Sequence, residues 1–109
     1  MLKDWHRTDI FSALESRGWR DPSREPNDGY FVGELYMFSK ADRRLHVAFV
    51  ADIGTGFSTA KSIEEVWATL AGVTDRAELW LSRRRDGKWH AALREWVEHI
   101  ARIEGAEGG

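Results

Sequence analysis

The chain has 109 residues, a length that suits one domain able to bury about 60–70% of its unfolded surface without a disulfide or a metal. It has no cysteine, which excludes disulfides, thiolate metal ligands and thiol nucleophiles, and which fits a reducing compartment. Eighteen acidic and sixteen basic residues give a net charge of −2, so no overall field attracts a nucleic acid. Because no segment approaches the roughly 20 apolar residues of a membrane span and the N-terminus has no apolar signal region, we expect a soluble, cytoplasmic protein.

Tryptophan is unusually frequent, with six copies spread along the chain at positions 5, 19, 67, 80, 89 and 96. Each indole can bury roughly 150–250 Å², so the domain carries more apolar anchoring surface than a core of this size usually needs. We therefore expect part of this surface to face a partner molecule.

The first periodic segment predicts a helix over residues 9–17. Gly18 is expected to end this helix in a left-handed conformation, which folds Trp19 back onto Leu14. The following segment, residues 21–29, contains both prolines and a turn-forming sequence, and we interpret it as a loop.

Two runs rich in aromatic and β-branched residues, 30–39 and 44–53, predict a β-hairpin around the polar residues 40–43. The second strand alternates, and we place one of its faces in the core, that of Leu45, Val47 and Phe49.

The length of the hairpin loop decides which face of the first strand joins this core. A loop of three or five residues places Leu35 and Met37 there, whereas a loop of four residues sets Glu34 opposite Phe49. We predict an odd-numbered loop, because it keeps the carboxylate out of the core.

The odd-numbered loop leaves a second sheet face that is too apolar to be an ordinary wet surface. Either the first helix or another molecule must then cover it. Aromatic side chains gathered in one patch are typical of interface hot spots. The candidate partner-binding residues on this face, with one from a later strand, are Tyr30, Val32, Tyr36, Phe38, His46 and Trp80.

The second half of the chain contains three further predicted elements. A capping-box pattern followed by apolar residues at helical spacing predicts a short helix over residues 62–72. Residues 77–84 alternate and predict a third strand, with Leu79 and Trp80 on opposite faces.

The last element is a helix predicted over residues 88–103, with Asp86 as its N-cap. The alternative is that Asp86 and Gly87 turn a hairpin, but an apolar stripe sustained over four turns favours the helix. The glycine-rich residues 105–109 predict a disordered tail, so a single domain is expected to span residues 1–104.

These elements predict an α+β domain with the order α-β-β-α-β-α and a small sheet that contains an antiparallel hairpin. The last helix is expected to cover the core face of the hairpin. The other sheet face is open to two interpretations: it is covered by the first helix, or it is a binding surface.

One segment resembles known phosphate-binding turns. Residues 52–61, Asp-Ile-Gly-Thr-Gly-Phe-Ser-Thr-Ala-Lys, resemble the phosphate-binding turn of the sugar-kinase and actin-like ATPase superfamily. The string from Ser58 to Lys61 is similar to the S-x-x-K motif of serine β-lactamases and penicillin-binding proteins. These enzymes need further domains that this chain is too short to contain, so we interpret the segment as a glycine-rich turn and assign no family.

A basic cluster follows the third predicted strand, and it comprises Arg83, Arg84, Arg85 and Lys88. These side chains could contact phosphates while Trp80 and Trp89 stack on bases, which is the chemistry that single-stranded nucleic acid needs. The structural alternative is a charged edge strand that resists aggregation. We favour the latter, since the net charge is close to neutral.

The histidines predict neither a metal site nor a clear catalytic group. His90 and His99 fall on opposite flanks of one helix and cannot share a metal. His46 could form an acid–base group with Glu34 and Tyr36, but a polar seam on a partner-facing surface is the more common arrangement.

Together these patterns predict a small intracellular protein-binding module, such as an adaptor, an inhibitor or an immunity-type protein, that acts by occupying a partner's surface. The expected partner is another protein or a second copy of the chain. The alternative is a nucleic-acid-binding module that uses residues 83–85. We expect no catalytic residue, no metal and no cofactor.

Overall fold

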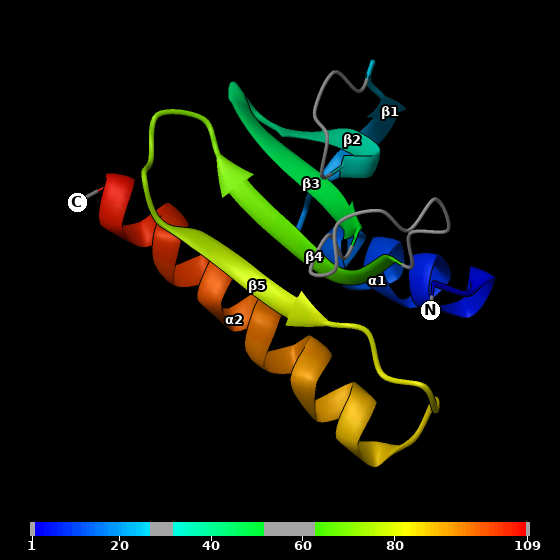
Figure 1. Cartoon of the computed structure of the whole chain (residues 1–109). Helices are drawn as coiled ribbons and strands as arrows, with labels where there is room; N and C mark the ends of the chain where they lie inside the picture. The colour runs from blue at the N-terminus through cyan, green and yellow to red at the C-terminus, as the bar shows by residue number, and fades with distance from the viewer. Residues whose placement is uncertain (1, 27–31, 52–62, 109) are drawn as a thin grey trace.

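The computed structural model describes residues 2–26, 32–51 and 63–108, except for the side chains of residues 32, 51 and 106–108. Five strands form one antiparallel sheet in which each strand pairs with its neighbours along the chain, in the order β1-β2-β3-β4-β5. A helix precedes the sheet and another follows it (Figure 1). The elements are α1 (Asp4–Glu15), β1 (Arg20–Arg24), β2 (Val32–Lys40), β3 (Arg43–Ala51), β4 (Ile63–Leu70), β5 (Arg76–Trp80) and α2 (Gly87–Gly108).

Both helices pack on the same face of the sheet, which makes a two-layer α+β domain. The long helix α2 lies along β5, and α1 covers β2 (Figure 1), where Phe11 contacts the rings of Tyr36 and Phe38 edge-on at 5.0 and 5.2 Å. Residues of both helices and of strands β2 to β5 form one buried cluster. The prediction that the last helix covers the face of Val47 and Phe49 is consistent with this cluster, in which all three elements meet.

The α+β class is confirmed, but the predicted order of elements is wrong at residues 62–72. This segment contains β4 rather than a helix, and the buried residues Val66, Ala68 and Leu70 recur every second position. An isoleucine, a valine, a tryptophan and a threonine favour an extended strand, and the two neighbouring strands supply backbone partners on both edges. The apolar spacing fits both periods, so tertiary pairing decided between them.

Three further features differ from the predictions. Helix α1 begins at Asp4 rather than near residue 9. The predicted loop at residues 21–29 contains β1, which pairs with the edge of β2. Helix α2 continues to Gly108, into the tail that was predicted to be disordered.

The predicted hairpin register is also wrong. Lys40 pairs with Arg43, so the loop has two residues, and Glu34 lies opposite Phe49. Ala41, the first loop residue, has a positive φ of 54°. Non-glycine residues rarely adopt this conformation, which is why the sequence Ala-Asp gave no signal for a tight turn.

Several local predictions are confirmed. Gly18 has a φ of 93°, and the amide of Trp19 donates to the carbonyl of Leu14 over 3.1 Å, as a Schellman motif requires. The Asp86 carboxylate accepts hydrogen bonds from the first amides of α2, those of Lys88 and Trp89.

Candidate functional site

The face of the sheet that points away from both helices is the first candidate site. The pairing register places on it every second residue of β2 to β5, and none of the described helices covers it. We call it the open face. Its described residues are Leu35, Met37, Ser39, Arg44, His46, Ala48, Val50, Glu65, Trp67, Thr69, Arg76, Glu78 and Trp80.

Two tryptophans dominate the open face. Trp80 is 67% exposed and is the exposed large apolar side chain of the described residues. Trp67 is half-buried, and the guanidinium of Arg76 lies over its ring, 3.7 Å from the ring centre. Arg76 also donates to the carboxylate of Glu78 over 2.9 Å. The guanidinium thus makes a cation–π contact with Trp67 and an ion pair with Glu78.

Charge is distributed unevenly along the open face. Glu65 pairs with Trp80, and Glu78 pairs with Trp67, so both carboxylates lie toward one end of the strands. Arg76 and His46 flank Thr69 in the next row, and Arg44 lies one row further on. The face thus has an acidic end and a basic end, which meet on β5 where Arg76 contacts Glu78.

The structure redistributes the predicted partner-binding residues. His46 and Trp80 lie on the open face. Phe38 is fully buried and Tyr36 is half-buried, both beneath α1, so these two belong to the core face instead. This correction follows from the register, since an even-numbered loop moves every side chain of β2 to the opposite face of the sheet from the one predicted. Tyr30 lies outside the described residues, as does the side chain of Val32.

The same register separates the predicted His46, Glu34 and Tyr36 group. Glu34 and Tyr36 point toward the helices, while His46 points to the open face. Leu35, Met37 and Trp67 take their place on the open face, and the sequence pattern missed them because it assigned them to the core. Once the parity of the hairpin loop is known, the alternation of the first strand identifies Leu35 and Met37, whereas Trp67 requires residues 63–70 to be a strand.

Glu34 forms a polar network with α1 instead. Its carboxylate accepts hydrogen bonds from Arg7 Nε at 2.9 Å and from the Tyr36 hydroxyl at 2.7 Å. The hydrogen bond from Arg7 outweighs burial and lowers the pKa of Glu34 below its usual value. Burial and the hydrogen bond to Glu34 raise the pKa of Tyr36. These groups satisfy one another, as buried charges require, and they link α1 to β2.

A second polar contact fixes the start of α1. The Nε2 atom of His6 donates to the carbonyl of Ser82 over 2.6 Å, while Nδ1 accepts from the amide of Lys3 over 2.9 Å. The ring stacks on Trp5 and meets Trp89 edge-on. Burial lowers the pKa of His6, so the imidazole is held in its neutral form. We assign these contacts a structural role.

The basic cluster divides into structural and free side chains. Arg85 donates twice to the carboxylate of Asp9 in α1, and the indole of buried Trp89 donates to the same carboxylate over 2.8 Å. Trp89 is therefore unable to stack on a base, and Arg85 is occupied. Arg83, Arg84 and Lys88 are exposed, and their side chains make no hydrogen bond or ion pair within the described residues.

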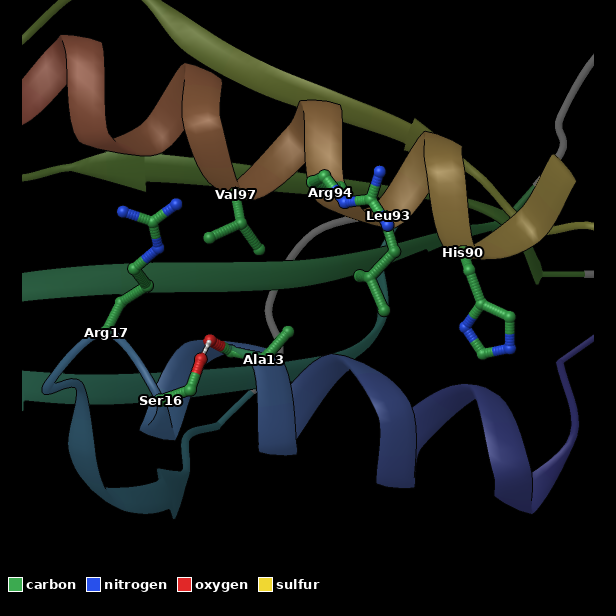
Figure 2. Close-up of a pocket in the computed structure, with 7 residues that line it drawn as sticks. All are labelled: Ala13, Ser16, Arg17, His90, Leu93, Arg94 and Val97. Carbon is green, nitrogen blue, oxygen red and sulfur yellow. Dashed lines mark hydrogen bonds between the residues drawn. The ribbon is translucent and has the colours of Figure 1, made fainter. Parts of the chain in front are cut away.

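A groove between the two helices is the second candidate site, and it has a volume of about 290 Å³. Its floor is apolar, and basic side chains stand around it. In Figure 2, Arg17 reaches from α1 toward α2, and His90 reaches from α2 toward α1. The lining residues are Ala13, Ser16, Arg17, His90, Leu93, Arg94 and Val97.

Neither a metal site nor a membrane span emerges from the residues that the structure describes. They contain no cluster of histidine, aspartate and glutamate side chains suited to a metal ion, and no helix is long and apolar enough to cross a bilayer. The segment of residues 52–61, with its resemblance to phosphate-binding turns, lies outside the described residues.

We compared the chain with protein-family models, with curated proteins and with solved structures, and none of them matches it.

Proposed function

We propose that this protein is a small protein-binding module of the adaptor, inhibitor or immunity type, and that it acts by occupying a partner's surface with its open face. The observation that carries this proposal is the 67% exposure of Trp80 beside Trp67 on a sheet face that the described helices leave uncovered. An exposed tryptophan next to apolar neighbours is what interface hot spots are made of. Because Trp80 lies on a sheet, the backbone is already ordered, and binding loses no backbone entropy there.

The occupant that this face fits best is a second copy of the chain. In a face-to-face dimer with a two-fold axis across the strands, the acidic end of one open face meets the basic end of the other. Glu65 and Glu78 would then lie near Arg44 and Arg76 of the other copy, with Trp67 on β4 and Trp80 on the edge strand β5 both within the contact. Complementary charges of this kind select the orientation of an apolar contact more than they strengthen it.

Light scattering at about 100 μM protein tests the proposal, because mass action makes weak association visible at such concentrations. We expect a dimer for the wild type and a monomer for Trp80→Ser. The exposed residue His90 lies in the helix layer, so His90→Ser is the control and should remain dimeric. If the wild type stays monomeric, the proposal that a second copy of the chain binds the open face is contradicted. A partner protein that binds wild type and Trp80→Ser equally contradicts the open face as the binding site.

Nucleic-acid binding remains the second candidate function, because exposed Trp80 is followed closely by the free cations Arg83 and Arg84. Sheet faces with exposed aromatic rings can stack single-stranded bases while nearby cations hold the phosphates. Glu65 and Glu78 on the same face oppose a polyanion, which places this function second. Binding of a labelled single-stranded oligonucleotide at about 50 mM salt, lost in Arg83→Ala/Arg84→Ala but kept in Lys3→Ala, would reverse this order.

A further inference from the structure

The groove between α1 and α2 is a second site with its own chemistry. The two helices run side by side across the same sheet face, and on the side of α1 that lines the groove the residues Ala13 and Ser16 are small (Figure 2). Side chains of this size do not fill the space between neighbouring helices. A floor of Leu93 and Val97 is left at the bottom of an open cavity of about 290 Å³. This volume lies at the small end of the range of ligand sites.

The charges around the groove are of one sign. Arg17, which follows the end of α1, lines the same cavity as His90 and Arg94 of α2, and no carboxylate is among the lining residues. The side chains of Arg17 and Arg94 make no hydrogen bond or ion pair within the described part of the chain.

Three other arginines of the chain are neutralised locally, whereas Arg83 and Arg84 are not. Arg7, Arg76 and Arg85 each pair with a carboxylate. The carboxyl end of α1 can stabilise Arg17 through the helix dipole, but Arg94 lies in the interior of α2, where that effect is absent. The cavity therefore presents two guanidinium groups without a carboxylate partner, and both can donate hydrogen bonds to an anion.

We propose that this groove binds a small organic anion, with a carboxylate or phosphate group held by Arg17 and Arg94 and an apolar body resting on Leu93 and Val97. Guanidinium groups suit both anions because their N–H donors match the paired oxygens. His90 lies one turn from Arg94 on α2, at the opposite end of the groove from Arg17, and is placed to donate a further hydrogen bond (Figure 2). The site lies on the helix layer and is independent of the open face.

Chemical-shift titration of the ¹⁵N-labelled protein with phenyl phosphate tests this site. We expect saturable shifts at the amides of Ser16, Arg17 and Arg94, with a dissociation constant about tenfold lower than that of inorganic phosphate or benzyl alcohol. Inorganic phosphate lacks the apolar body and benzyl alcohol lacks the charge, so the two comparisons separate the contributions. Phenylacetate serves as the carboxylate probe, and the ratio of the two affinities shows which anionic group the site prefers.

The variant Arg17→Gln/Arg94→Gln should weaken phenyl phosphate binding about tenfold or more. Arg102→Gln, which removes an exposed charge of α2 outside the groove, should leave it unchanged. Wild-type affinities that are equal for all probes, or equal in the two variants, would overturn the proposal. The arginines would then act only as solvated charges at the edge of the helix layer.

Discussion

Glu34 is the residue at which the sequence was most misleading. A carboxylate opposite Phe49 looks wrong for a core, and this was the reason for rejecting the even-numbered hairpin loop. In the structure Arg7 and the Tyr36 hydroxyl satisfy the carboxylate, so Glu34 can lie in the core opposite Phe49. Arg7 lies 27 residues away on another element, so no local pattern could pair the two.

The first prediction concerns this ion pair. Glu34→Ala should lower the free energy of unfolding by about 2–3 kcal/mol, because it leaves the Arg7 guanidinium and the Tyr36 hydroxyl without their hydrogen-bond acceptor. The loss stays below that of a fully buried pair, since the Arg7 side chain is 31% exposed. Asp4→Ala removes the other carboxylate that contacts Arg7, but that carboxylate is in water, so urea denaturation should show a change below about 0.5 kcal/mol. Equal losses in the two variants would contradict a core role for Glu34.

The second prediction concerns acid stability. The pKa of His6 is lowered by burial, so the unfolded chain takes up a proton near pH 6.5 that the folded chain resists. The free energy of unfolding should therefore fall as pH drops below 6.5, and fall again below 4.5, where protonation of Glu34 removes its pairing with Arg7. Urea midpoints measured from about pH 7.5 to 5.5 should decline for the wild type and stay level for His6→Gln. A level wild-type profile would show that His6 is not held neutral.

At the scale of the elements, the sequence predicted those whose signals are local. The Schellman end of α1, the Asp86 cap and the stripe of α2 depend on residues within a few turns of one another. Strands β1 and β4 depend on their neighbours, and the tight turn at Ala41 depends on a conformation that alanine seldom adopts. These features were missed because pairing across the sheet, rather than local preference, determines them.

The third prediction separates a strand from a helix at residues 63–70. Ala68 is fully buried beneath the helices, whereas the neighbouring Thr69 points to the open face, where its pairing partner is Arg76. Ala68→Asp should abolish folding, because it buries an unpaired charge, while Thr69→Asp should remain folded. Circular dichroism and thermal melting compare the two variants directly. Tolerance of Ala68→Asp would contradict the β4 register.

At the scale of the whole molecule, the open face is a consequence of where the two helices pack. Both cover one side of a five-stranded sheet, so aromatic side chains on the other side have no described helix above them. The sequence predicted a partly apolar face that needs a cover, but the register error assigned Tyr36 and Phe38 to it in place of Leu35 and Met37. Trp67 was missed because residues 62–72 were predicted to be a helix. Of the predicted residues, Trp80 and His46 stay on this face.

The most direct measurement of the central claim is chemical crosslinking of single-cysteine variants, which is clean in a chain with no cysteine. Thr69→Cys places a thiol on the open face, and Ser12→Cys places one on the exposed side of α1. With a short bis-maleimide at about 100 μM protein, we expect a covalent dimer from Thr69→Cys, and only monomer from Ser12→Cys and from Thr69→Cys/Trp80→Ser. Equal crosslinking of Thr69→Cys and Ser12→Cys, or a dimer from Ser12→Cys alone, would contradict association through the open face.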